Sequence, residues 1–286
     1  MPAVDGAGFR FSFEEEGAGR PVLLLHSTAS GAMQWASLTG HLRGRYRVLA
    51  VDLPGYGATV RIANRDAPGL AGHAAVVRAV ADHCGEPVHL VGHSFGGAVA
   101  LKAALADPEC IRSLTVIEPV AFNVLRAGTD ADRHLAREVD ALAGLIAACV
   151  ADDAPEAALA HFIDFWNGTG AWSVLPARTR AHLSAQVGAI VDDFAAGRGE
   201  IWPAEACRTI AQPTLAVMGM QSKPHSQRVT EMVAEAIPGG RLHMVLDAGH
   251  MLPLTHPRLL NPMIAAFLAE ADLRGTVSPR DYGRAA

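Results

Sequence analysis

The sequence predicts an α/β protein in which helices cover both faces of a mostly parallel, doubly wound sheet. Short, predominantly apolar runs alternate with stretches of helical composition, and such runs are typical of strands buried on both faces. The apolar runs lie at 22–25, 48–51, 88–91 and 114–117, and the helical stretches at 35–42, 70–84 and 97–106. From about residue 122 to residue 203 this alternation stops, which indicates a helical insertion between two halves of one sheet.

The remaining segments complete this organisation. Residues 9–15 alternate between apolar and polar side chains, as a strand with one buried face does, and glycines at 17 and 19 turn the chain. The insertion contains three amphipathic stretches, at 132–150, 154–166 and 178–195. Strand patterns return at 214–218 and 241–246, followed by a helix at 257–268. We therefore predict a core of 1–121 and 204–274, a helical cap of 122–203 and a loose polar tail of 275–286.

Composition excludes several classes of protein. The chain has 286 residues, of which 50% are hydrophobic and 19% charged, which fits one compact globule. Its formal net charge of −5 and the lack of a basic patch argue against a nucleic-acid partner. The four cysteines are scattered without a Cys-x-x-Cys pair, so we expect neither a disulfide framework nor a metal site, and no cofactor is indicated. No apolar run approaches the ~20 residues of a bilayer span, and the start lacks a basic and apolar leader, so we expect a cytoplasmic protein with no membrane partner.

The segment 88–104 carries the strongest chemical signal. It reads as a strand, then Gly92-His93-Ser94-Phe95-Gly96, then a helix, which is Gly-x-Ser-x-Gly in the context that gives the motif its meaning. So tight a turn forces strained backbone angles on Ser94 and needs glycines where strand and helix pass closely. The Ser94 hydroxyl then lies at a helix N-terminus, where the helix dipole favours developing negative charge. Ser94 is therefore the predicted nucleophile.

This arrangement resembles the α/β-hydrolase fold family, and the resemblance covers nearly the whole chain. It implies a nucleophile, an acid and a histidine in that chain order, with a helical cap inserted in the sheet. Residues 246–253 follow the last apolar strand and resemble the Gly-His loop of the family. The resemblance thus implies that His250 is the general base and acid, a role suited to an imidazole that titrates near neutrality.

The acid departs from the commonest family pattern. After the strand at 214–218 the position expected to hold an aspartate is Ser222, and a neutral serine cannot stabilise an imidazolium as a carboxylate does. Glu118 instead ends the strand 114–117, where some branches of the family place their acid, and active residues belong at this edge of a sheet. We predict Glu118 as the acid. Asp247 and a Ser–His dyad without an acid remain alternatives.

Residues 23–28 end an early strand and resemble the oxyanion loop of the family, with Ser27 in place of its glycine. The resemblance implies that the N–H of Phe95 pairs with the N–H of Thr28, or of Ser27, to hold an oxyanion. His26 is expected to support this loop. Asp52 lies in a turn that resembles a scaffolding turn of the family, so we assign it no catalytic role.

The expected partner is a small apolar molecule bound between sheet and cap. The predicted lining residues are Trp35, Phe122, Phe162, Trp166, Trp172 and Met251. A serine nucleophile favours acyl transfer to water, so we predict carboxylic ester hydrolysis through an acyl-enzyme. The Ser-Phe-Gly-Gly turn also resembles that of C–C hydrolases of ring-cleavage products, which is one alternative. A lyase, a cyclase or a ligand-binding protein on the same fold is another alternative, because the commonest position of the acid holds no carboxylate.

Overall fold

The computed structural model describes residues 2–61 and 69–274, and a sheet of nine described strands forms its centre. The spatial order is β1-β2-β4-β3-β6-β7-β8-β9, with β5 paired to β2. The strand β2 pairs antiparallel with β1, β4 and β5. The pairings from β4 across the sheet to β9 are all parallel, so the predicted mostly parallel sheet is confirmed. The strands are β1 Ala3–Gly6, β2 Phe9–Glu16, β3 Arg20–Leu25, β4 Tyr46–Val51, β5 Val60–Arg61, β6 Val88–His93, β7 Ile111–Ile117, β8 Thr214–Gly219 and β9 Arg241–Val245.

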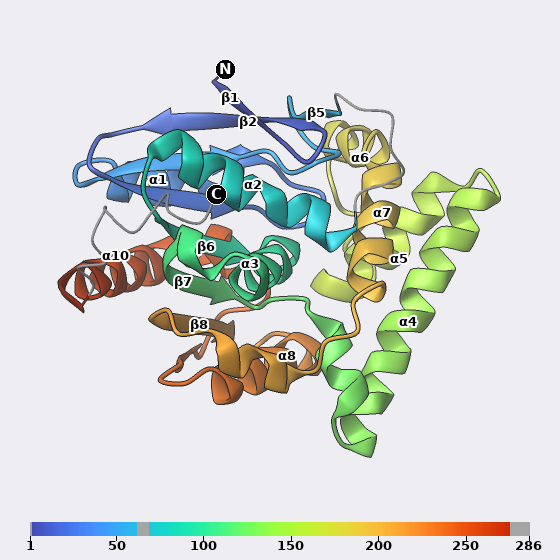
Figure 1. Ribbon diagram of the computed structural model, residues 1–286. Coiled ribbons are helices and arrows are strands. Elements are labelled where there is room, and N and C mark those ends of the chain that lie inside the picture. The colour runs from blue at the N-terminus through green and yellow to red at the C-terminus, as the bar shows by residue number, and fades with distance from the viewer. Residues whose placement is uncertain (1, 62–68, 275–286) are drawn as a thin grey trace.

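Helices cover both faces of this sheet, which explains why its central strands are mainly apolar on both faces. Alternate side chains of β3 enter different clusters: Leu23 and Leu25 pack with α2 and α3, whereas Val22 and Leu24 pack with α1 and α10. In Figure 1, α2 and α3 cross in front of the strands. The covering helices are η1 Ala32–Trp35, α1 Ala36–Leu42, α2 Leu70–Cys84, α3 Phe95–Ala106, η2 Pro108–Cys110, α8 Pro224–Ala236, α9 Leu252–Thr255 and α10 Pro257–Arg274.

The chain between β7 and β8 is helical wherever it is regular, and it contains a buried apolar cluster of its own. Figure 1 shows these helices grouped beyond one end of the sheet, with the long α4 on the outside. They are η3 Phe122–Ala127, α4 Asp130–Ala151, α5 Pro155–Asn167, α6 Ala177–Ser184, α7 Val187–Arg198 and η4 Ala204–Thr209. We call the segment 122–203 the cap.

Two details of the sequence prediction need correction. The stretch 178–195 is not one helix but two, because α6 ends at Ser184 and α7 begins at Val187. The helix α8 was not predicted at all, since it begins directly after the polar loop that follows β8. The expected tail, 275–286, lies outside the described residues.

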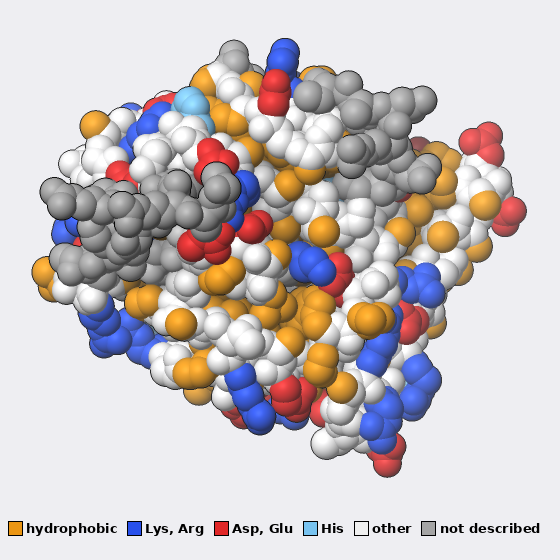
Figure 2. All heavy atoms as spheres, in the orientation of Figure 1, with side chains coloured by type: hydrophobic (Ala, Val, Ile, Leu, Met, Phe, Trp, Pro, Cys, Tyr) orange, Lys and Arg blue, Asp and Glu red, His pale blue; other side chains and the backbone are white. Residues whose placement is uncertain are grey.

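The surface carries mixed charges. On the face shown in Figure 2, acidic and basic side chains are interspersed over the helices and neither sign forms a continuous field. Within residues 2–61 and 69–274, no helix combines the length and apolar character that crossing a membrane requires.

Candidate active site

Ser94 occupies a strained turn between β6 and α3. Its backbone angles are φ 56° and ψ −116°, a conformation that L residues rarely adopt. Two glycines make the turn possible, because a Cβ on Gly92 would lie 2.2 Å from the Gly96 carbonyl oxygen and one on Gly96 would lie 2.3 Å from the Leu25 oxygen. The Ser94 N–H donates to the Ile117 carbonyl at 2.9 Å, which ties the turn to β7. The sequence therefore fixes where the hydroxyl stands.

His250 reaches this hydroxyl from the loop after β9. Its Nε2 lies 3.0 Å from the Ser94 Oγ, and its Nδ1 lies 2.6 Å from a carboxylate oxygen of Glu118. All three side chains are buried. The structure thus brings together Ser94, His250 and Glu118, which are separated by as many as 156 positions in the chain. Asp247 is exposed, and the Nδ1 contact of His250 goes to Glu118 instead.

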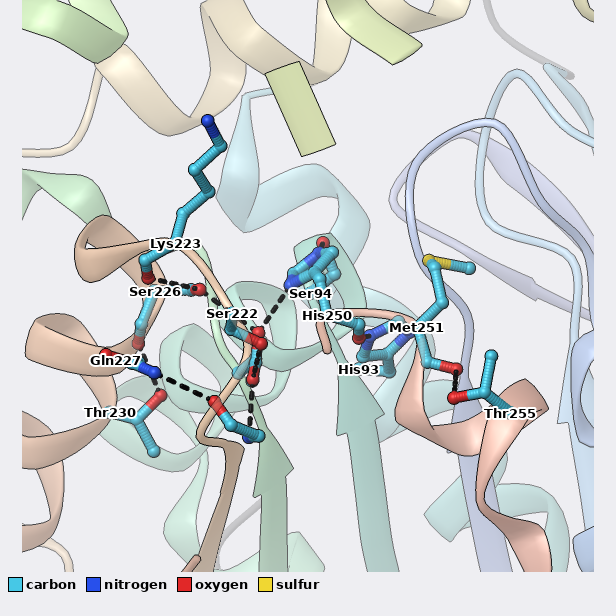
Figure 3. Close-up of polar contacts among 12 residues, drawn as sticks. His93, Ser94, Ser222, Lys223, Ser226, Gln227, Thr230, His250, Met251 and Thr255 are labelled. Carbon is cyan, nitrogen blue, oxygen red and sulfur yellow. Dashed lines mark hydrogen bonds and ion pairs between the residues drawn. The ribbon is translucent and has the colours of Figure 1, made fainter. Parts of the chain in front are cut away.

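Four donors surround the Glu118 carboxylate. Its Oε1 accepts the Gly219 N–H at 2.7 Å and the Ser222 hydroxyl, while its Oε2 accepts the His250 Nδ1–H and the Ser226 hydroxyl at 3.0 Å. Figure 3 shows Ser222, Ser226 and His250 converging on this point. The commonest family pattern has an acid in the loop after β8. Here that loop instead supplies hydrogen-bond donors to Glu118, which directly follows β7. Position 222 therefore holds a partner of the carboxylate.

These donors decide the charge of the acid. Burial by itself acts to raise the pKa of Glu118, but the hydrogen bond and the charge of His250, with Ser222 and Gly219, outweigh it and hold that pKa below its ordinary value. Glu118 is accordingly an anion at neutral pH. A buried carboxylate that accepts four hydrogen bonds has its two oxygens fully satisfied. This negative charge lies directly next to the Nδ1 of His250.

The loop after β3 holds Ser27 and Thr28 differently. The Ser27 N–H donates to the Gln34 Oε1 at 3.1 Å, and the Ser27 hydroxyl donates to the same oxygen at 2.7 Å. This N–H is therefore already occupied. Among residues 2–61 and 69–274, the Thr28 N–H has no hydrogen-bond partner. The Phe95 N–H is the first donor of α3, one that a helix leaves without an internal partner.

Two buried histidines support the two loops. The His26 Nε2 accepts the Leu53 N–H at 2.9 Å and its Nδ1 donates to the Ser27 carbonyl at 2.7 Å. The His93 Nε2 donates to the His250 carbonyl at 2.8 Å, and its Nδ1 accepts from the Gln34 amide at 3.2 Å. Burial lowers the pKa of His26 to about 4 and that of His93 to about 3, so both rings are neutral. Gln34, which the sequence analysis missed, thus links the Ser27 loop to the His250 loop.

A cavity of about 240 Å³ opens above Ser94, between the sheet and the cap. Its wall is mainly apolar and includes four of the six predicted lining residues, Phe122, Phe162, Trp166 and Met251. The other two lie elsewhere, which corrects the prediction. Trp35 is 1% exposed and packs in the apolar cluster that contains residues of α1 and α10. Trp172 packs inside the apolar cluster of the cap.

Asp193 is the least expected residue of this wall. It is 3% exposed and lies on α7, on the same buried stripe as Ile190 and Ala196. The spacing of Asp193 from these two residues is the sequence signal that could have identified it. A carboxyl on the apolar face of a helix is costly unless it is hydrogen-bonded. Phe194, which follows it, also lines the cavity. In the part of the chain that the structure describes, no group of three or more His, Cys, Asp or Glu side chains is suited to a metal ion.

Comparison with known proteins places the chain in a wide family. Residues 22–262 match the profile of the Alpha/beta hydrolase family. The chain is 27% identical to the dihydrolipoyllysine-residue acetyltransferase component of an acetoin cleaving system from Cupriavidus necator, over 93% of this chain and 67% of that one. It is 26% identical to a 2-hydroxymuconate semialdehyde hydrolase from Pseudomonas sp. strain CF600, over 94% of both. An esterase structure from Exiguobacterium antarcticum aligns with a TM-score of 0.74 at 19% identity, covering 93% of this chain and 98% of that one.

Proposed function

Because the chain belongs to the Alpha/beta hydrolase family, we propose that it is a serine hydrolase that cleaves a carboxylic ester, or a related acyl bond, of a small apolar substrate. One observation carries this proposal. The Ser94 hydroxyl, the His250 ring and the Glu118 carboxylate form one continuous line of hydrogen bonds, with contacts of 3.0 and 2.6 Å. A nucleophile, a base and an anion that orients the base are the parts that acyl transfer to water requires.

The proposed reaction has two halves. The Ser94 Oγ attacks the ester carbonyl carbon while its proton passes to the His250 Nε2. His250 then returns that proton to the departing alkoxide, which leaves as an alcohol and yields an acyl-enzyme. A water molecule attacks the acyl carbonyl, again with His250 as base, and the carboxylic acid leaves as the Ser94 hydroxyl is restored. Glu118 holds the Nδ1–H throughout and stabilises the imidazolium formed in each half.

Two backbone donors complete the proposed site. The N–H groups of Thr28 and Phe95 remain for the oxyanion, since the N–H of Ser27 already binds Gln34. In comparable enzymes the loss of one such donor costs about 2.7–4 kcal/mol of transition-state stabilisation. The strained angles of Ser94 keep its hydroxyl and the Phe95 N–H at the same end of α3, which favours this arrangement.

The cavity wall supports an apolar acyl or aromatic group as the bound part of the substrate. Aromatic side chains of the cap, including Phe122 of η3, make up much of this wall. Burial of apolar surface is worth roughly 25 cal/mol per Å², so such a wall selects by shape and hydrophobicity. The cap thereby sets which substrates reach Ser94.

A second candidate is hydrolysis of a C–C bond next to a ketone. It is favoured by the likeness, over 94% of both chains, to a protein named 2-hydroxymuconate semialdehyde hydrolase. Both reactions use a nucleophile, a base and an oxyanion site, and they differ in the bond that is broken. Comparison of kcat/KM for 2-hydroxymuconate semialdehyde with kcat/KM for p-nitrophenyl esters of increasing chain length separates them.

Labelling with a fluorophosphonate probe tests the proposal directly. We expect the probe to modify Ser94, as located by mass spectrometry of the labelled peptide, and the Ser94→Ala variant to lose both labelling and turnover of p-nitrophenyl butyrate. Removal of the nucleophile is expected to lower kcat by about 10⁶-fold, down to the assay background. An unlabelled Ser94, or a Ser94→Ala variant that keeps its turnover, contradicts a serine hydrolase and leaves a lyase, a cyclase or a binding protein.

A further inference from the structure

A cap residue holds the loop that carries the proposed oxyanion donor. The Thr28 hydroxyl donates to the Asp193 Oδ2 at 2.7 Å, and the Tyr56 hydroxyl donates to the same oxygen at 2.7 Å. Asp193 belongs to α7 of the cap, whereas Thr28 and Tyr56 belong to loops of the core. A single carboxyl of the cap therefore binds two segments of the core, which lie 137 and 165 positions from it in the chain.

The loop needs such an anchor. Ala29, next to Thr28, has a φ of 59°, a left-handed conformation that costs a non-glycine residue energy and persists only where its surroundings enforce it. Ser27 stands where the family resemblance expects glycine, and Gln34 fixes it through its N–H and its hydroxyl. Asp193 likewise fixes Thr28, in this case through the side-chain hydroxyl alone.

We propose that Asp193 is a positioning residue, which sets the direction of the Thr28 N–H through the Thr28 hydroxyl and so makes a complete oxyanion site depend on the seated cap. This inference rests on the proposed hydrolase function. In it, the cap acts on the reaction as well as on substrate choice, because helix α7 must be in place for Thr28 to be held. The residue touches no reacting atom; it acts through Thr28.

The surroundings of Asp193 favour a neutral carboxyl group that accepts hydrogen bonds over a charged carboxylate. The second carboxyl oxygen, Oδ1, is buried and has no hydrogen-bond partner in the described chain. Burial is the main cause that raises the pKa of Asp193 to about 8, against the opposing hydrogen bonds of Tyr56 and Thr28, and the neighbouring Asp192 raises it further. The group is thus mainly a neutral acid at pH 7, and both hydroxyls that contact it lie on Oδ2.

The Thr28→Val variant is the sharpest test, since it removes only the anchoring hydroxyl and keeps the shape and the N–H of the residue. We expect kcat for p-nitrophenyl butyrate, and the rate of Ser94 phosphonylation by a fluorophosphonate, to fall about tenfold with KM nearly unchanged. This is less than the roughly 10²–10³-fold loss when an oxyanion donor is itself removed. Thr115→Val is the matched control, because it removes a buried hydroxyl of β7 that has no hydrogen-bond partner among the described residues.

Two variants of the anchor complete the test. Asp193→Ala should lower kcat as Thr28→Val does. The kcat of the double variant should be no lower than that of the less active single variant, since both substitutions remove the same interaction. Asp193→Asn should restore most of the rate, because an amide oxygen accepts both hydroxyls. Full activity of Thr28→Val, additive losses, or a change confined to KM overturns the proposal. A failed hydrolase assignment differs from all of these, because Ser94 of the unaltered protein then takes no label.

Discussion

The indole of Trp166 lies face to face with the imidazole of His250, with ring centroids 4.2 Å apart and ring planes 18° apart. Trp166 comes from α5 of the cap, and Phe122 stacks on it in turn at 6.2 Å. The cap therefore covers the proposed base with an aromatic face. When His250 accepts the Ser94 proton, the resulting cation lies against the electron-rich face of an indole, an arrangement that stabilises positive charge.

Replacement of Trp166 should accordingly slow the proposed reaction. A cation–π contact is worth about 0.5–2 kcal/mol, so Trp166→Leu is expected to lower kcat about two- to thirtyfold. Trp166→Phe, which keeps a smaller aromatic face, should retain an intermediate rate. Steady-state kinetics on a p-nitrophenyl ester provide the measurement. If the leucine and phenylalanine variants have equal kcat and differ only in KM, Trp166 serves the cavity wall alone.

The acid is tested by comparison of Glu118 with Ser222. Glu118→Gln removes the negative charge next to the His250 Nδ1 and should lower kcat by about 10³–10⁴-fold, as neutralisation of a triad acid does in a serine protease. Ser222→Ala removes one of four donors to that carboxylate and should cost less than about tenfold. Rates at pH 8, with circular dichroism to check folding, decide between them. Near-full activity of Glu118→Gln instead points to a dyad or to Asp247.

The fold could be predicted wherever a local pattern decides the structure. The apolar runs of β3, β4, β6 and β7 were recognisable because both faces of these strands are buried, and the predicted helix 70–84 matches α2. The break between α6 and α7 was not recognisable, because apolar residues continue across it at helical spacing. Edge strands such as β1 carry too few residues for a pattern.

The residues of the candidate site likewise divide into those that a local sequence pattern predicts and those that it does not. Ser94 and His250 lie in motifs that are local in the chain, and Glu118 ends a recognisable strand. Their partners cannot be seen locally. The contact of Thr28 with Asp193 spans 165 positions, and that of His250 with Glu118 spans 132. The packing of distant helices likewise decides in which apolar cluster Trp35 is buried.

The neutral Asp193 predicts a pH dependence of stability. Its pKa is raised to about 8 in the folded protein, chiefly by burial, from an ordinary value of 3.8. Between about pH 4 and pH 8 the folded state therefore keeps a proton that the unfolded state has lost. The stabilisation is fully present below about pH 4 and is lost as pH rises to about 8, with a slope of at most about 1.4 kcal/mol per pH unit.

Urea unfolding of the protein and of Asp193→Asn from pH 4 to pH 9 measures this effect. The free energy of unfolding of the asparagine variant, minus that of the unaltered protein, should grow with pH and level off above about pH 8. Asp164→Asn gives a control without pH dependence in this range, because the N–H groups of Trp172 and Gly170 lower the pKa of Asp164 and so confine its effect on stability to pH values below about 4. A difference that stays constant with pH for Asp193→Asn shows that this carboxyl is ionised throughout.

Gln34 is expected to matter for both stability and rate, because it joins the two loops of the site. Gln34→Leu leaves the buried Ser27 N–H without its acceptor and removes the donor to His93. An unsatisfied buried donor costs about 1–3 kcal/mol, which sets the expected loss of unfolding free energy. We also expect a lower kcat, since Ser27 precedes Thr28 and His93 holds the His250 carbonyl.

Gln212→Leu is the matched control for this change. Its amide donates to the Pro108 carbonyl at 2.7 Å, just before β8 and away from the residues that line the cavity, so the substitution should alter stability without a change in kcat. Chemical denaturation and steady-state kinetics on both variants separate the two effects. Unchanged kcat in Gln34→Leu at a temperature where the variant is folded shows that the loops keep their positions without this link. A loss of kcat in Gln34→Leu alone places Gln34 among the residues that position the site.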